Sequence, residues 1–225
     1  MADAVQPFPS ATVVLLRDGE NGCEVLLVRR SKKLDFHGGA WVFPGGRIDP
    51  ADYAAAGSEA VVDAARFAAA REAREETGLD IDTEHLVLVS RWITPERLPK
   101  RFDTYFFATA APEGVVRVDG GEISTHRWFG AAEALEAHRK GEIELPPPTF
   151  VTLHRLVPFR TSREALEKLA RGPVETFLPR LWPTDGGACI VYPGDAAYDD
   201  GDLARSGPRH RLWVVGSDWQ YERTP

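Results

Sequence analysis

The sequence predicts an α/β protein, and three observations lead to that prediction. Short apolar stretches that alternate like β-strands flank a long alanine-rich stretch of helical character, and another helical stretch follows the last of these strands. The chain has 225 residues, of which 43% are hydrophobic, so it can bury a full core. Three consecutive prolines at 146–148 mark a boundary, after which helical patterns lead into a Trp- and Gly-rich tail.

The elements of the first half are a hairpin, a short strand and a long helix. Residues 11–16 and 23–28 alternate like paired strands around a Gly- and Asn-containing turn at 18–22. A polar loop at 31–39 and a short strand at 40–43 follow. The helix is expected at 58–77, with Ser58 as its N-cap and a stop at Thr77 and Gly78.

The second half continues with strands, then helices, then a hairpin. Strands are expected at 86–92, 104–108, 115–118 and 125–129, and helices at 131–139, 149–157 and 162–170. Residues 188–192 and 210–215 can pair across an acidic loop at 194–202. Aromatic residues spaced along such strands are more often core residues than a binding surface, so we expect Trp213, Trp219 and Tyr221 to pack inward.

The expected helix carries three acids on one face. Glu72, Glu75 and Glu76 lie within roughly a 100° arc at about 100° per residue. Their mutual repulsion costs a few tenths of a kcal/mol per pair on a wet surface, and more where water is excluded. Arg71 can offset only part of this charge, which favours a divalent cation with oxygen ligands. The alternative is an ordinary solvated helix face.

The context of the acids resembles a known family. Residues 71–79 read REAREETGL and residues 43–46 read FPGG. Together they resemble the Nudix hydrolase signature, which is Gly, five residues, Glu, seven residues, then R-E-(apolar)-x-E-E-x-G-(apolar). The resemblance covers about residues 11–160. It implies an α/β/α sandwich with a mixed sheet at 1–145, and we expect residues 146–225 to form an extension packed on the same domain.

The first half of the signature departs from this pattern. Counting forward from Gly46 places Asp52 at the first Glu, whereas counting back from Arg71 places Asp63 there, with Gly57 as its glycine. An insertion of about eleven residues between the loop and the helix reconciles the two counts. Asp49, Asp52 and Asp63 therefore remain open candidates, and each can equally be a helix cap or a solvated acid.

The resemblance implies metal-dependent hydrolysis of a phosphoanhydride. In that reading Glu72, Glu75, Glu76 and the Gly45 carbonyl bind Mg²⁺ or Mn²⁺, and Arg71 orients the acids. The two glycines let the backbone approach ion and phosphate closely.

A further acid from outside the helix acts as base or ligand in this family. We select Glu122, in the loop ahead of the last strand of the sheet, with Glu113 or Asp119 as alternatives and a solvated turn acid as the competing interpretation.

The substrate class rests on a weaker resemblance. Residues 26–31, followed by Gly39 and FPGG, are similar to the motif of coenzyme A diphosphatases, although Val28 replaces a Thr and Asp35 an Arg. ADP-ribose, dinucleotides and NDP-sugars share the phosphoanhydride and stay open as substrates. We expect Gly46 and the cations Arg30, Lys100 and Arg101 to contact the substrate.

Alternatives of another class are a non-catalytic nucleotide-sensing module and a redox metal site. A sensor is expected to lack Glu75 or Glu76, and both are present. A di-iron site needs Glu-x-x-His pairs on facing helices, and the sequence contains none.

The composition limits the kinds of partner that the protein is expected to bind. The net charge of −7 argues against stable nucleic-acid binding and against membrane binding, so the expected partner is a small nucleoside diphosphate derivative. Two cysteines are too few for a disulfide framework. With no signal-peptide pattern and no apolar run near 18 residues, we expect a cytoplasmic protein, and the sequence leaves a homodimer open.

Overall fold

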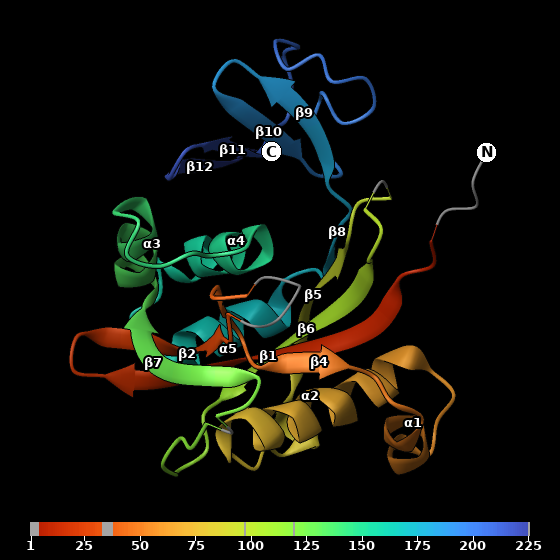
Figure 1. The fold of residues 1–225 in the computed structure, drawn as a ribbon, viewed down its shortest axis with the longest axis vertical. Helices are drawn as coiled ribbons and strands as arrows, with labels where there is room; N and C mark the ends of the chain where they lie inside the picture. The colour runs from red at the N-terminus through yellow and green to blue at the C-terminus, as the bar shows by residue number, and fades with distance from the viewer. Residues whose placement is uncertain (1–4, 33–37, 97, 119, 225) are drawn as a thin grey trace.

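The structure is a computed structural model that describes residues 5–32, 38–96, 98–118 and 120–224. A mixed sheet lies between two groups of helices (Figure 1). One face carries α1 (Pro50–Ala56) and α2 (Val61–Thr77). The other face carries α3 (Ala131–Arg139), α4 (Pro147–Leu156) and α5 (Ser162–Arg171). This is the α/β/α sandwich expected from the sequence.

The main sheet has eight strands in the order β3-β2-β1-β6-β5-β8, with β4 paired to β1 and β7 paired to β2. Their bounds are β1 Phe8–Gly19, β2 Gly22–Arg30, β3 Trp41–Val42, β4 Gly45–Arg47, β5 Val87–Ile93, β6 Phe102–Ala110, β7 Ile123–Gly130 and β8 Glu175–Phe177. The β1–β6 and β5–β8 pairs are parallel and the others antiparallel, so the sheet is mixed. A 3₁₀ turn, Thr83–His85, precedes β5.

The segment from β3 to β4 bridges the two arms of the first hairpin. β1 and β2 pair next to their turn, from Leu16↔Val25 to Gly19↔Gly22. Farther along, β2 pairs with β3 and β1 pairs with β4. The chain bends at Pro44, and Gly45 and Gly46 begin β4. This Pro44-Gly45-Gly46 segment, called the glycine turn below, therefore lies within the main sheet.

Helix α2 packs on the sheet through small side chains. Its alanines at 65, 68, 69 and 73 are buried in one cluster with residues of β1, β2 and β6, and Ala64 is also buried. The helix ends at Gly78, whose φ of 71° is left-handed and whose N–H donates to Arg74 O at 2.8 Å. An alanine face permits close approach, which brings the acidic turn of the helix against the glycine turn.

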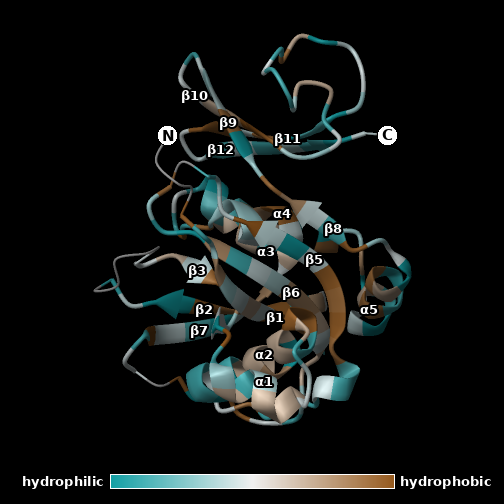
Figure 2. Cartoon of the chain, turned by 90° about the vertical axis from the view of Figure 1, so that its right-hand side faces the viewer, coloured by the Kyte–Doolittle hydropathy of each residue, from teal (hydrophilic) through white to brown (hydrophobic). Residues whose placement is uncertain are grey.

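A second sheet stacks above α3 and α4 (Figures 1 and 2). It has the order β12-β11-β10-β9 and comprises β9 Arg180–Thr184, β10 Gly187–Val191, β11 His210–Val215 and β12 Asp218–Arg223. Its buried residues Ile190, Tyr192 and Leu212 share one core with the main sheet. Between them, Trp92 stacks on Phe177 with ring centroids 3.8 Å apart.

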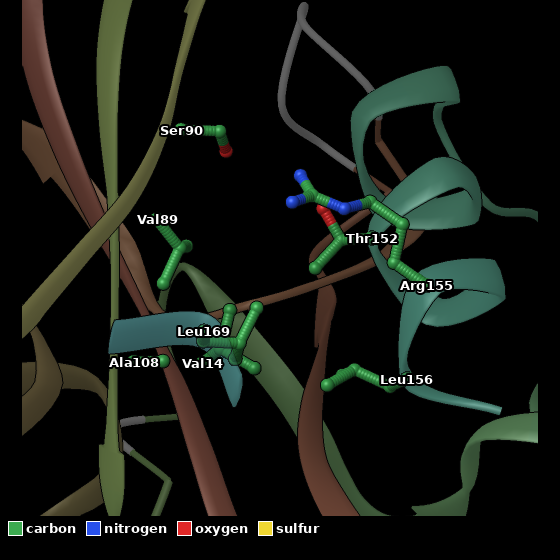
Figure 3. Close-up of a pocket in the computed structure, with 8 residues that line it drawn as sticks. All are labelled: Val14, Val89, Ser90, Ala108, Thr152, Arg155, Leu156 and Leu169. Atoms are coloured by element: carbon green, nitrogen blue, oxygen red, sulfur yellow. The ribbon is translucent and has the colours of Figure 1, made fainter. Parts of the chain in front are cut away.

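Packing between the main sheet and α4 and α5 leaves one small cavity of about 10 Å³, lined by Val14, Leu156, Leu169 and their neighbours (Figure 3). That volume holds no more than a water-sized probe. No helix in the described ranges combines the length and apolar character that a bilayer crossing requires.

Most expected elements are present, with local differences. The two predicted hairpins are confirmed. The expected strand at 115–118 is wrong, because that segment has no ladder partner and loops over the end of α2, where Arg117 N donates to Thr77 O at 2.8 Å. Ser58 is not the N-cap of α2, which starts after Ala60. Helix α1, inside the insertion, was not predicted.

We propose that residues 146–225 form an extension of one domain. In support, β8 adds to the main sheet, and α4 and α5 cover one of its faces. A buried ion pair holds the second sheet together: Arg211 donates to both carboxylate oxygens of Asp195, at 2.6 and 2.8 Å. Burial acts to raise the pKa of Asp195, but hydrogen bonds from Arg211, His210 and Ala197 outweigh it and lower the pKa to about 2.

Asp195→Ala should therefore destabilise the whole domain, because it strands a buried guanidinium. We expect a loss of about 3 to 5 kcal/mol in the free energy of unfolding at pH 7, seen as one shifted transition in denaturant. The wild-type contribution should be present above pH 4 and vanish as the pH falls through about 2. Asp199→Ala, at an exposed carboxylate, is the control. A separate early transition would show that the extension folds independently.

Candidate active site

The Pro44-Gly45-Gly46 turn is held tightly against β1. The Pro44 carbonyl accepts hydrogen bonds from Thr12 Oγ1 at 2.5 Å and from Val13 N at 3.0 Å. A Cβ on Gly45 would lie 2.4 Å from the Ala11 carbonyl oxygen. Only glycine fits there, because the contact is with backbone.

The other side of the turn faces the acids of α2. Gly45 N donates to Glu76 Oε2 at 3.0 Å. A Cβ on Gly46 would lie 2.4 Å from the Glu72 carboxylate. The turn and the helix thus approach as closely as backbone and carboxylate allow, so the sequence motifs at 43–46 and 71–79 lie in contact.

Arg71 lies at the centre of the acids. Its Nε and Nη2 donate to the two oxygens of Asp52 at 3.1 and 3.0 Å, in a bidentate pair. Its Nη1 donates to Glu72 at 2.9 Å and to Glu75 at 3.2 Å, and Nη2 also reaches the Arg47 carbonyl at 2.9 Å. One guanidinium therefore links α1, β4 and α2.

Of the three acids left open by the two counts, Asp52 makes the most extensive contact with Arg71. Asp52 is 3% exposed and binds Arg71. Asp63 instead accepts a hydrogen bond from Ser58 at 2.7 Å. Asp49 is the N-cap of α1, where its N–H donates to Asp52 at 2.8 Å, and its carboxylate lies 3.7 Å from Arg71.

Two of the glutamates are perturbed by burial. Desolvation raises the pKa of Glu76 to about 8, against the opposing effect of its hydrogen bond from Gly45. The charge of Arg30 lowers this pKa and that of Glu122 raises it, so both side chains lie near Glu76. Burial also raises the pKa of Glu72, which Arg71 opposes. Glu75 is largely exposed.

The structure brings Arg30 and Glu122 to the same edge of the site. Arg30 ends β2 and pairs with Ile123 of β7, and Ser31 N donates to the Glu122 carbonyl at 2.7 Å. Glu122 is exposed to solvent. Glu113 is exposed in the loop over the end of α2, whereas the alternative Asp119, like Asp35 of the coenzyme A motif, lies outside the described residues. Of the candidates that can be placed, Glu122 is the one whose charge acts on Glu76.

The other two expected cations lie at the start of β6. Lys100 is exposed, with Nζ 5.6 Å from the Phe102 ring. Arg101 is only 6% exposed and donates to the carbonyls of Thr94 at 3.1 Å and Val5 at 2.7 Å. The expectation that Arg101 receives a substrate phosphate does not agree with this placement, because its guanidinium ties the N-terminal segment to the β5–β6 connection.

The donor set fits a hard divalent cation, although no group of three or more His, Cys, Asp or Glu side chains in the described ranges converges as a formed metal site. The available ligands are carboxylate and carbonyl oxygens, which Mg²⁺ and Mn²⁺ prefer. Buried Glu76 bears a carboxylate whose ionisation a cation would favour. Glu72 and Glu75 face Arg71, and Glu75, with a side chain 59% exposed, has room to reorient.

Sequence reasoning undervalued Asp52 and missed Arg47. Asp52 could have been ranked first from its position six residues after Gly46, as in the signature. The Arg47 carbonyl accepts from Arg71, and its guanidinium lies 3.9 Å from the Phe8 ring centroid. No sequence signal pointed to Arg47, because it binds Arg71 through its backbone carbonyl, which any residue would supply.

Comparison with known proteins agrees with this geometry. The sequence matches the NUDIX domain over residues 7–147. Among curated proteins, it is 25% identical to an acyl-coenzyme A diphosphatase NUDT19 of Xenopus laevis, over 80% of this chain and 73% of that protein. It is 36% identical to the human protein of the same name, over 51% of this chain but only 32% of the relative's length.

Solved structures give the same result. The fold is similar to a NUDIX hydrolase from Alicyclobacillus acidocaldarius, with a TM-score of 0.69 and 28% identity over 75% of this chain and 99% of that one. It also resembles the NUDIX domain of Shewanella oneidensis NrtR, with a TM-score of 0.51 and 17% identity over 67% of this chain and 86% of that one, a likeness of fold alone. The chain belongs to the Nudix family and is a Nudix hydrolase.

Proposed function

We propose that this Nudix hydrolase is a divalent-metal-dependent enzyme that cleaves the phosphoanhydride of a nucleoside diphosphate linked to another moiety. The observation that carries the proposal is the contact of the glycine turn with the acidic turn of α2, in which Gly45 binds Glu76 and Gly46 abuts Glu72. The arrangement gathers oxygen donors beside a backbone that a phosphate can approach.

The proposed ligands of Mg²⁺ or Mn²⁺ are Glu72, Glu75, Glu76 and the Gly45 carbonyl. When bound, the cation would neutralise the diphosphate and lower the pKa of a bound water. Arg71 holds Glu72 in place, and Asp52 in turn holds Arg71 through two hydrogen bonds. Glu122, whose charge acts on Glu76, is the proposed acid from outside the helix that takes up a proton. We expect Arg30 and Gly46 to contact the phosphates, and exposed Lys100 precedes the start of β6.

For the substrate we propose coenzyme A or an acyl-coenzyme A. The support is the name of the curated relatives together with the motif at residues 26–46. ADP-ribose, dinucleotides and NDP-sugars are the competing substrates. A panel of these diphosphates, assayed for released monophosphate with Mg²⁺ or Mn²⁺, distinguishes them. We further propose a cytoplasmic protein that acts on a small molecule, not on nucleic acid or membrane.

Glu75→Gln should reduce kcat by at least about 100-fold with little loss of stability, because it removes a charge from the metal site and keeps the shape. The matched control is Glu167→Gln on α5, where Arg163 pairs with an exposed glutamate four residues on, as Arg71 does with Glu75. Turnover within a few-fold of wild type at saturating metal would mean that Glu75 belongs only to a solvated helix face.

Asp52→Asn should lower kcat about 10- to 100-fold, the usual cost of losing a group that orients a metal ligand. The amide cannot accept both guanidinium bonds, so Arg71 would no longer be fixed against Glu72. Asp63→Asn is the control, since Asp63 contacts Ser58 instead. A greater loss in the Asp63 variant would reverse the assignment of the first acid.

The metal-free protein should lose stability as the pH rises from about 5 to about 8. In that range Glu76 stays protonated in the folded state, with its pKa near 8, but ionises on unfolding. Glu76→Gln should flatten this slope in denaturant titrations with EDTA. Mn²⁺ or Mg²⁺ should raise the melting temperature, and by more at pH 8 than at pH 6. Identical pH profiles for wild type and variant would contradict the burial argument.

A further inference from the structure

A pocket of about 760 Å³ lies on the face of the main sheet opposite α2. Three parts of the chain line it: the β2–β3 connection, the segment after α3, and the turn between β11 and β12 of the second sheet. The contributing residues are Arg29, Lys32, Gly38, Gly39, Trp41, His138, Gly141, Glu142, Ile143, Glu144, Gly216, Ser217 and Trp219. The volume lies in the range of small-molecule sites.

The charges of the described lining residues balance. Among them, two cations, Arg29 and Lys32, stand against two acids, Glu142 and Glu144. A polyphosphate would gain little from such a lining, because attraction to one pair is offset by repulsion from the other. An uncharged group that offers hydrogen bonds is the better occupant.

Aromatic side chains form two sides of the pocket. Trp41 is fixed edge-on against Phe129, with ring centroids 5.3 Å apart. Trp219 packs on His138 at 4.7 Å and on Phe150 at 5.3 Å. His138 is 5% exposed, its Nδ1 accepts from Leu145 N at 3.3 Å, and its Nε2 has no hydrogen-bond partner among the described residues. A polar group that reached past Trp219 would satisfy this buried nitrogen.

Residues that line the pocket are close in the chain to residues of the active site. Arg29 pairs with Trp41 across β2 and β3, and the charge of the next residue, Arg30, acts on Glu76 of the active site. Gly45 follows Trp41 by four residues, a chain distance of at most about 13 Å at the rise of a strand. A flexible arm attached to a diphosphate at the glycine turn can span that distance.

We propose that the C-terminal extension completes this pocket to bind the neutral, amide-bearing arm of a coenzyme A-type substrate, so that the β11–β12 turn selects the substrate. The inference rests on the proposed function and deepens it. It gives the extension a part in recognition, beyond its contribution to the core. ADP-ribose carries no such arm, and its hydrolysis should not depend on the turn.

The test replaces a residue at the pocket wall without touching the core. Ser217 is exposed in the turn and lines the pocket, whereas its neighbour Asp218 is exposed and does not line it. Ser217→Tyr should raise KM for coenzyme A about 10-fold, roughly the loss of one good contact, and leave kcat and KM for ADP-ribose unchanged. Asp218→Tyr, which adds the same bulk to the same turn, should match wild type on both substrates.

Each result has a definite meaning. A KM increase confined to coenzyme A and to Ser217→Tyr supports the pocket. Equal changes on both substrates, equal effects of the two variants, or no effect of either variant would overturn it while leaving the hydrolase standing. If wild type cleaves ADP-ribose but not coenzyme A, both the substrate proposal and this inference are wrong.

Discussion

The ion pair between Arg71 and Asp52 is the interaction on which the rest of the site depends. Asp52 is almost fully buried, so its two hydrogen bonds to Arg71 form in a poorly screened environment. With Nε and Nη2 engaged, the guanidinium plane is fixed, and Nη1 can point only toward Glu72 and Glu75. The orientation of the acids is therefore set from α1, an element with no acid of its own in the proposed metal site.

The same network leaves the site short of positive charge. Arg71 contacts four carboxylates but not Glu76, for which the described residues supply the Gly45 amide as hydrogen-bond donor. Such a buried acid is costly to ionise, which is why its pKa rises to about 8. The charge of Arg30 opposes this rise without cancelling it. The presence of a buried acid that is costly to ionise is consistent with a site that binds a cation from solution.

The sequence predicted the parts of this site that depend on local spacing. The helix, its glycine stop and the glycine turn each have a local signature, and so their meeting could be inferred. Asp52 was ambiguous because two counts competed, and only the fold shows which acid reaches Arg71. Arg101 was misjudged for the opposite reason: a cation near an expected phosphate site looks functional in sequence, whereas its burial and its bonds to Thr94 and Val5 are tertiary facts. The strand expected at 115–118 failed because β-propensity does not supply a ladder partner.

The extension supplies one side of the proposed pocket and leaves the acids of α2 and the glycine turn untouched. Its second sheet meets the main sheet where Tyr192, next to β10, packs edge-on to Phe177 at 5.2 Å, and Phe177 in turn stacks on Trp92 within the main sheet. Close-packed aromatic contacts of this kind transmit position, because rings in a dense core have few alternative arrangements. The β11–β12 turn is thereby held at a fixed place over α3, on the sheet face opposite the acids. Changes in that turn can alter what the pocket admits while α2 and the glycine turn, on the other face, keep their geometry.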